Sequence, residues 1–328
     1  MAELRGGIDL GGTKIEAIIV DEENSILSSA RHPTPVSGGP DAVAAKIADA
    51  LKEAAGAAGV APAALLGVGV GSPGTVSPAG VVSSARNLPD WNGSFPLGGT
   101  LEAALGTSVR VGNDVAVGTQ AEFRIGAARR YSSVLGVFWG TGVGGGIILN
   151  KKLWHGRGGA GEIGHVVVKP GGRRCGCGHR GCLEAYAGRA SMEAKARRSM
   201  KKGTKSDLLK VMERKGRERF SSSVWHEAVE KGDALAISLI DGAVDALGVG
   251  IASAVNLLDV EAVIIGGGLG VRFGQPVVDR IAAAMGPHLF PGHAMPAVEL
   301  SSLGDAGGAL GAALLVSPPP RRRSARSA

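Results

Sequence analysis

Two segments of the chain share one pattern, in which two apolar runs flank a short turn rich in glycine. Residues 7–20 read GIDLGGTKIEAIIV, and residues 133–149 read SVLGVFWGTGVGGGIIL. Apolar runs joined by a tight glycine turn are typical of paired strands. Because each half of the chain opens on the same unit, the sequence predicts an internal duplication. We expect two α/β domains with a ligand cleft between them.

The length of 328 residues is sufficient for two domains, each with its own core. We predict a small α/β domain made of residues 1–114 plus about 304–317, and a large α/β domain of residues 115–303. The final helix is expected to pack back on the small domain. Residues 318–328 are rich in Pro, Arg and Ser, which predicts a disordered basic tail.

Periodicity and turn residues predict the remaining elements. Helices are expected at 41–58, 115–124, 184–258 (in several pieces) and 306–316, and strands at 66–70, 109–112 and 262–265.

The net charge of +7 raises the possibility of a nucleic-acid partner, but the charge is localised. Residues 189–219 hold twelve Lys or Arg and four Asp or Glu, a pattern typical of a solvated helix surface. Aromatic residues make up only 4% of the chain, which leaves little material for stacking on bases. We expect no nucleic-acid partner. We also expect no membrane span or leader segment, and a reducing cytoplasmic location.

All three cysteines lie close together, as Cys175, Cys177 and Cys182, and His165 precedes them by ten residues. Three thiols and one imidazole match the tetrahedral ligand set of structural zinc. An odd number of cysteines cannot all pair as disulfides, and three in eight residues are an unusual pattern for a core. The sequence therefore predicts a structural zinc site that holds Glu162, His165 and Glu184 in place.

Three glycine turns follow predicted strands and are candidate nucleotide contacts. In the first, Asp9 can hold Mg²⁺ and the backbone of Gly11, Gly12, Thr13 and Lys14 can cradle phosphate. The second, beginning Gly140, Thr141, Gly142, contains a G-x-G-x-x-G pattern, but a strand and not a helix follows it, which excludes the dinucleotide fingerprint. The third, Gly266, Gly267 and Gly268, is placed to pass under an adenosine.

Asp114 is the candidate general base, because it follows a strand whose carboxyl end points toward the ligand side of an α/β sheet. The alternative is that Asp114 only caps the helix expected at residue 115.

Four motifs together resemble the ROK family of sugar kinases and repressors. They are DLGGTK at 9–14, GTGVGGG at 140–146, E-x-G-H at 162–165 and C-G-C-G-x-x-G-C-L-E at 175–184. The resemblance covers nearly the whole chain to about residue 316. It implies an actin-like, hexokinase-type fold and Mg²⁺-dependent transfer of the ATP γ-phosphoryl group to a hexose, commonly to O6 of glucose.

The resemblance also implies roles for individual residues. Asp114 takes the hydroxyl proton, while the zinc ligands are His165, Cys175, Cys177 and Cys182. Residues implied to bind the hexose are Gly74, Asn87, Asn113, Asp114, Glu162, His165 and Glu184. His165 can serve both the metal and the sugar only if its two ring nitrogens divide the work. A homodimer is expected from the resemblance alone.

The leading hypothesis is an ATP-dependent glucokinase. A kinase for fructose, mannose, N-acetylglucosamine or N-acetylmannosamine is the alternative within the same class, and a non-catalytic sugar-binding regulator is the alternative outside it. About six residues precede the first predicted strand, too few for a DNA-binding helix-turn-helix, so we expect the kinase. Polyphosphate stays open as a second phosphoryl donor.

Overall fold

The computed structural model describes residues 3–85, 87–292 and 294–316, which fall into two compact units. Unit 1 comprises Met1–Ala121 and Ala306–Ala328, and unit 2 comprises Glu122–Asp305. The domain limits predicted from the sequence stay a prediction, and the predicted disordered tail, 318–328, lies outside the described residues.

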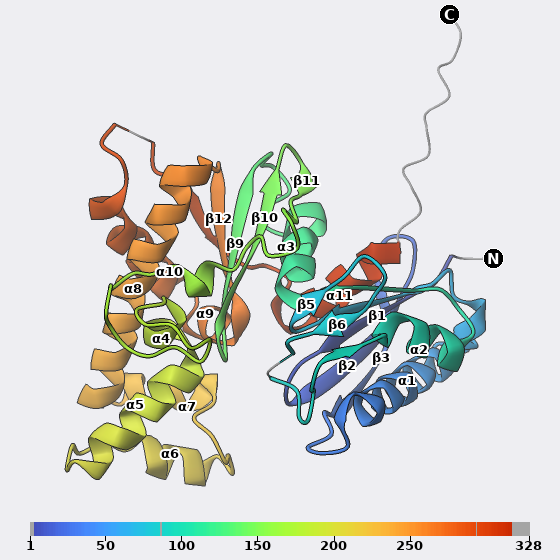
Figure 1. Cartoon of the computed structure of the whole chain (residues 1–328), viewed down its shortest axis with the longest axis horizontal. Helices are drawn as coiled ribbons and strands as arrows, with labels where there is room; N and C mark the ends of the chain where they lie inside the picture. The colour runs from blue at the N-terminus through green and yellow to red at the C-terminus, as the bar shows by residue number, and fades with distance from the viewer. Residues whose placement is uncertain (1–2, 86, 293, 317–328) are drawn as a thin grey trace, which may run out of the picture. The chain divides into compact units, whose positions relative to one another are not determined.

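Unit 1 is built on a five-stranded mixed sheet (Figure 1). Its strand order is β3-β2-β1-β4-β8, in which β1, β2 and β3 are antiparallel neighbours and β1, β4 and β8 run parallel. The strands are β1 (Arg5–Leu10), β2 (Lys14–Val20), β3 (Ile26–Pro33), β4 (Val68–Ser72) and β8 (Val109–Asn113).

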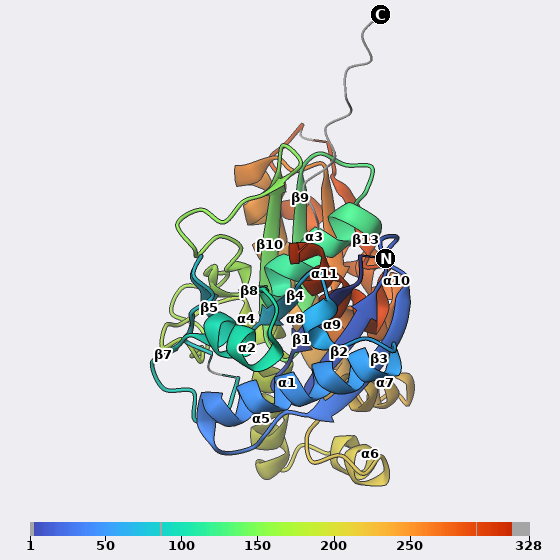
Figure 2. The ribbon, with the colours of Figure 1, turned by 90° about the vertical axis from the view of Figure 1, so that its right-hand side faces the viewer.

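Helices cover both faces of this sheet, as two neighbouring glycines of β1 show. A Cβ on Gly6 would meet Leu51 of α1 (Gly39–Ala57), whereas a Cβ on Gly7 would lie 2.1 Å from the backbone oxygen of Ala309 in α11 (Gly307–Ala313). Successive residues of a strand point to opposite faces, so α1 and α11 lie on opposite sides of the sheet. Figure 2 shows α1 in front of β2 and β3, on which it packs. The final helix therefore packs on the first sheet, as expected.

Unit 2 repeats the same sheet plan. Its strand order is β11-β10-β9-β12-β13, with β9, β10 and β11 antiparallel and β9, β12 and β13 parallel. In each sheet the first hairpin supplies the central strand, and the two later strands add to it in parallel. This matching topology supports the predicted duplication. The strands are β9 (Val134–Trp139), β10 (Val143–Leu149), β11 (Lys152–Leu153), β12 (Ala262–Gly266) and β13 (Ala297–Leu300).

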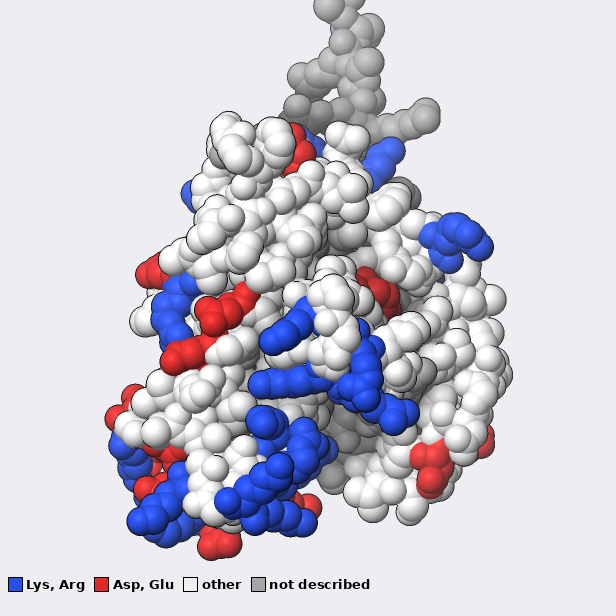
Figure 3. Space-filling view, turned by 60° about the vertical axis from the view of Figure 1, so that its left-hand side comes forward, with Lys and Arg blue, Asp and Glu red and all other residues white. Residues whose placement is uncertain are grey.

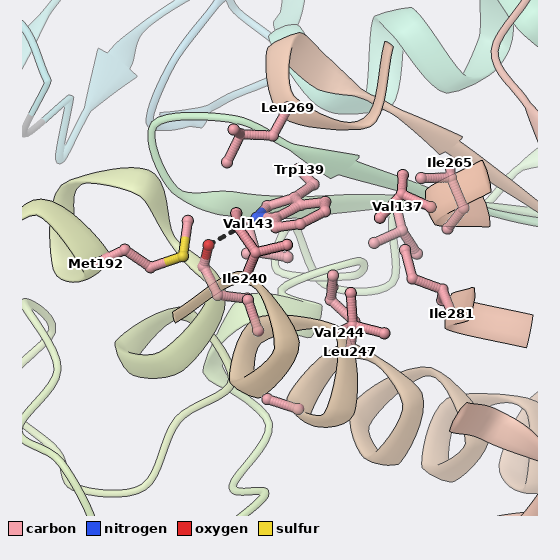
Figure 4. Close-up of a cluster of buried hydrophobic side chains, with 14 of the residues drawn as sticks. Val137, Trp139, Val143, Met192, Ile240, Val244, Leu247, Ile265, Leu269 and Ile281 are labelled. Atoms are coloured by element: carbon pink, nitrogen blue, oxygen red, sulfur yellow. Dashed lines mark hydrogen bonds between the residues drawn. The ribbon is translucent and has the colours of Figure 1, made fainter. Parts of the chain in front are cut away.

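The main core of unit 2 lies between this sheet and α8 (Ala234–Leu258). Val137 and Trp139 of β9 point toward Ile240 and Val244 of α8 (Figure 4). The indole Nε1 of the fully buried Trp139 donates to the backbone oxygen of Ala187 at 2.6 Å, so the polar atom of this core side chain is paired. That bond also ties the sheet to the segment that follows the cysteines.

Helix α8 is long and apolar enough to cross a membrane by length and composition alone, but 56% of its most apolar 18-residue stretch is buried inside the protein. Asp233 caps its start by accepting from the backbone N–H of Ala236 at 2.8 Å, and Asp259 ends it in the left-handed region. Because its apolar face lies in the core against the sheet and α10 (Gln275–Met285), we assign α8 as a core helix.

Several elements had no clear signal in the sequence, above all the small sheet β5-β6-β7 and the edge strand β13. Strands of two residues and an edge strand of four are too short to show a period. The remaining elements are β5 (Thr75–Val76), β6 (Val82–Ser83), β7 (Ser94–Phe95), α2 (Leu97–Leu105), α3 (Asp114–Ile125), α4 (Glu184–Ala187), α5 (Arg189–Lys201), α6 (Leu208–Arg214), α7 (Ser222–Glu230) and α9 (Gly267–Phe273), with 3₁₀ turns at Pro62–Ala64, Ile163–His165, Gly286–His288, Gly304–Ala306 and Leu314–Val316.

Candidate active site

The four predicted metal ligands meet in unit 2. The ligand atoms of His165, Cys175, Cys177 and Cys182 all lie within 4.8 Å of one another. Antiparallel bridges between Val167 and Cys182 and between Arg174 and Arg180 fold the cysteine segment back on itself. The folding of this short loop, and not a regular helix or strand, brings the four side chains together.

The spacing of these atoms fits a tetrahedral cation site. Four ligands about 2.3 Å from a central zinc lie about 3.8 Å from one another. The Sγ atoms of Cys177 and Cys182 are 3.7 Å apart, and Sγ of Cys175 lies 3.8 Å from Nδ1 of His165. His179 approaches only Cys177, with 3.8 Å between its Nδ1 and Sγ, and it is not among the four clustered ligands. The residues present therefore fit zinc.

Burial disfavours ionisation of two of the three thiols. Burial raises the pKa of Cys175 to about 12 and also raises the pKa of Cys182. A hydrogen bond from the backbone of His179 lowers the pKa of the more exposed Cys177. Thiolate is the form that binds metal, so a bound cation would offset the cost of ionising the two buried thiols.

The two ring nitrogens of His165 face different groups. Nδ1 lies on the side of Cys175, whereas Nε2 lies 3.8 Å from Oε2 of Glu162. His165 and Glu162 are both exposed; Glu162 directly precedes the 3₁₀ turn Ile163–His165, and His165 is the last residue of that turn. Nδ1 of His165 can therefore bind the metal while Nε2 stays available for a different partner.

Glu184 connects the cysteine segment with the glycine turn between β9 and β10. Its Oε2 accepts from the backbone N–H of Val143 at 3.0 Å, and its Oε1 lies 4.0 Å from Sγ of Cys175. A Cβ on Gly142 would lie 2.2 Å from Oε2 of Glu184, so a side chain at residue 142 would displace this carboxylate from its present position. One side chain thus links the metal cluster to the turn.

Two of the three predicted glycine turns also meet in unit 2. Strands β9 and β12 are parallel neighbours, and Gly266 pairs with Phe138, so their carboxyl ends lie at one edge of the sheet. A Cβ on Gly140 would lie 3.8 Å from the backbone nitrogen of Gly268, and one on Gly268 would lie 3.1 Å from Oγ of Ser222. Gly267 has a φ of 78°, and a Cβ added to it would lie 2.6 Å from the backbone nitrogen and oxygen of Trp139.

The first glycine turn lies in unit 1. The backbone N–H of Gly11 donates to the oxygen of Lys14 at 2.9 Å, which closes the turn, and a Cβ on Gly12 would lie 2.6 Å from the backbone oxygen of Asn87. Nζ of Lys14 lies 2.6 Å from Oε2 of the buried Glu16. The structure therefore places Asn87 next to the turn predicted to hold phosphate.

Asn113 and Asp114 lie at the carboxyl edge of the unit 1 sheet. Parallel pairing aligns Asp9 with Gly71, and Ser72 with Asn113. Oδ1 of Asn113 accepts from the backbone N–H groups of Val115 and Ala116, both at 3.1 Å, while its Nδ2 donates to the oxygen of Gly74 at 3.2 Å. Asn113 therefore caps the start of α3, and Asp114 also takes part, because its Oδ1 accepts from the backbone N–H of Val115 at 2.9 Å.

Two polar residues near these turns were not selected from the sequence, Arg189 and Ser222. Arg189 contacts Thr141 through its side chain, and Ser222 lies beside Gly268. Arg189 belongs to a basic segment that we interpreted as solvated surface, and only its position directly after the glutamate motif distinguishes it.

Comparisons with known proteins place the chain in context. The family model described as ROK family matches residues 5–318. The chain is 34% identical to a glucokinase of Thermotoga maritima over 313 residues, which cover 94% of this chain and 96% of that protein. It is 33% identical to an N-acetylgalactosamine kinase of Shewanella over 320 residues, covering 94% and 95% of the two chains.

A solved structure shows the same fold. It is a ROK family glucokinase from Streptomyces griseus in complex with glucose and AMPPNP, 33% identical, with a TM-score of 0.81 over 95% of this chain and 98% of that one. The predicted actin-like, hexokinase-type α/β fold is therefore confirmed.

Proposed function

The chain belongs to the ROK family as a sugar kinase, and on that premise we propose that it phosphorylates a hexose at O6 with ATP, glucose being the preferred substrate. The observation that carries the proposal is the cluster of His165 and three cysteines, with Glu162 and Glu184 attached to it. Carboxylates and an imidazole on a rigid loop are suited to bind sugar hydroxyls in fixed directions.

In the proposed reaction, Asp114 accepts the proton of the sugar hydroxyl. The hydroxyl oxygen then forms a bond to the γ-phosphorus, the bond from that phosphorus to the β–γ bridging oxygen breaks, and ADP leaves. The bond from Val115 to Oδ1 of Asp114 orients the carboxylate, and the Asn113 cap fixes the start of α3 beneath it. Hexose contacts are assigned to Gly74, Asn87, Asn113, Glu162, His165 and Glu184.

The nucleotide is assigned to the glycine turns. Residues 9–14 and 140–142 offer backbone N–H groups to phosphate, and residues 266–268 offer a flat surface to the adenosine. Asp9 would hold Mg²⁺, which neutralises phosphate charge when bound. Zinc, held by the four clustered ligands, would have a structural role only, because the protein supplies all four positions.

A kinase for N-acetylated hexosamines is the second candidate. It is favoured by the similarity to the N-acetylgalactosamine kinase, whose 33% identity nearly equals that of the glucokinase.

As accompanying predictions, we expect a cytoplasmic homodimer that binds neither nucleic acid nor membranes. Size-exclusion chromatography with light scattering measures the oligomeric state.

The test is an assay that measures the sugar phosphate formed from glucose, mannose, fructose and three N-acetylhexosamines, with ATP or polyphosphate as donor. We expect the highest kcat/KM for glucose with ATP. Replacing Asp114 with Asn should lower kcat by about 10²–10⁴-fold, the usual contribution of a general base, while glucose binding is kept. Asp49→Asn, an exposed change on α1, is the matched control. Glucose binding without turnover in the wild type would support the regulator instead.

A further inference from the structure

Arg189 is the first residue of α5, and three hydrogen bonds from Arg189 and Ala190 attach the start of this helix to the turn between β9 and β10. Two of them come from Arg189. Its backbone N–H donates to the oxygen of Gly140 at 3.1 Å, and the N–H of Ala190 donates to the oxygen of Thr141 at 3.0 Å. Its guanidinium Nη2 donates to Oγ1 of Thr141 at 2.7 Å. The guanidinium is therefore held in a fixed place beside the turn, unlike a long side chain that moves freely in solvent.

The charge of Arg189 is not neutralised by a direct ion pair. Within the described part of the chain, no carboxylate is paired with Arg189. The nearby Glu193 is instead occupied by Arg197, at 2.8 Å, and by the backbone N–H of Phe220, at 3.3 Å. Burial lowers the pKa of Arg189, and Arg219 lowers it further, while Glu193 acts in the opposite direction. A half-buried cation in such a place favours an anionic ligand.

The bond from Arg189 also determines what the Thr141 hydroxyl can do. A hydroxyl has one proton to donate and two lone pairs that accept. Because Oγ1 of Thr141 accepts from Arg189, its own proton is available for another acceptor. Arg189 therefore presents Thr141 as a donor, next to the glycine N–H groups of the same turn.

The surroundings are basic and include further donors. Figure 3 shows Lys and Arg side chains gathered on the lower part of this face, at the level of α5 and α6. Gly268, near the start of α9, lies beside Gly140 of this turn, and Ser222, at the start of α7, lies beside Gly268. The site thus combines positive charge with hydroxyl and backbone donors, the chemistry that binds phosphate oxygens.

We propose that Arg189 is a phosphate-binding residue of the nucleotide site, and that its guanidinium and the Thr141 hydroxyl together contact the β- or γ-phosphate. The inference rests on the proposed ATP-dependent function. It replaces the view of residue 189 as part of a solvated helix surface, which still holds for exposed neighbours such as Arg198.

The test measures the affinity of the full chain for Mg²⁺–AMPPNP, ADP and AMP by calorimetry. Arg189→Met keeps most of the aliphatic stem but removes the charge, so we expect at least about tenfold weaker AMPPNP binding, a factor typical of one lost charge-assisted hydrogen bond. Binding of AMP, which lacks both outer phosphates, should change by less than about twofold on the same scale. Glucose affinity should be unchanged.

Two further variants make the test decisive. Arg198→Met removes one exposed charge from the same helix and should leave AMPPNP binding unchanged. Arg189→Lys keeps the positive charge but not the planar guanidinium group, so its AMPPNP affinity should lie between those of the wild type and Arg189→Met. It replaces Arg189→Met in the test if that variant does not fold. Equal losses for AMP and AMPPNP, or none for either, would overturn the inference. A wild type that binds no nucleotide would overturn the proposed function as well, so the two failures are distinguishable.

Discussion

Oε2 of Glu184 accepts a hydrogen bond from the backbone N–H of Val143 at 3.0 Å, and this bond joins the cysteine segment to the second glycine turn. Val143 and Glu184 are 41 residues apart in the sequence. A displacement of the metal cluster is therefore expected to reach the turn directly. Sugar recognition and nucleotide binding, if both occur here as proposed, share this side chain as a mechanical link.

Two substitutions at Glu184 separate its charge from its hydrogen bond. Glu184→Gln keeps an acceptor for Val143 and should raise the hexose KM with little change in melting temperature. Glu184→Ala leaves the Val143 N–H without its partner, so the free energy of unfolding should also fall by about 1–3 kcal/mol. Steady-state kinetics and thermal unfolding report the two effects. Equal melting temperatures for both variants would contradict the structural role, with the exposed Glu218→Gln as control.

Metal removal should destabilise unit 2. We expect one zinc per chain by elemental analysis, and loss of both hexokinase activity and thermal stability on treatment with a strong chelator. The physical reason is that a metal that binds only the folded loop adds its binding free energy to the stability of the fold.

The variant Cys182→Ser provides the control for chelation. It replaces a fully buried ligand, so it should lower the melting temperature by itself and respond no further to the chelator. A wild type whose stability and activity are indifferent to chelation would rule out a structural metal.

Helix α11 packs so closely on β4 that no side chain fits at Gly69. A Cβ there would lie 1.7 Å from the backbone oxygen of Ala312, and backbone cannot rotate away as a side chain can. Gly69→Ala should therefore cost about 1–3 kcal/mol or more of unfolding free energy in denaturant titration. Gly56→Ala, in α1 with nothing within 4 Å of its Cβ position, should be neutral or stabilising by about 0.4–1 kcal/mol. A larger loss of unfolding free energy for Gly56→Ala than for Gly69→Ala would show that α11 does not pack on β4 as described.

The Glu16 carboxyl predicts an acid limit to stability. Burial tends to raise its pKa, but hydrogen bonds and charges from Lys14 and Arg31 outweigh burial, so the pKa is lowered from 4.5. A lowered folded pKa contributes stability above 4.5, and this contribution is lost as the pH falls through the folded value. Denaturant titration from pH 7 to 3 should show the stability difference between wild type and Glu16→Gln shrinking below pH 4.5. A difference that is constant with pH would contradict this account.

The amino-acid sequence alone was sufficient for the duplicated strand–turn–strand plan and for the ligand set of the metal cluster. Both are local signals. Glycine turns between apolar runs leave a periodic trace, and three cysteines within eight residues lie close together however the rest of the chain folds. The candidate nucleotide contacts at residues 9–14, 140–142 and 266–268 could also be identified from the sequence, because they too are glycine turns that follow apolar runs.

Only the tertiary structure decided which neighbours these residues have. Asn113 accepts from two backbone N–H groups at the start of α3, Lys14 pairs with Glu16, and Arg189 contacts Thr141 from 48 residues away. Such contacts depend on strand pairing and on helix packing across long stretches of chain, which leave no period in the sequence. The direction of each ring nitrogen of His165 is likewise set by the folded loop, because a side chain's rotamer follows from the groups around it and not from its position along the chain.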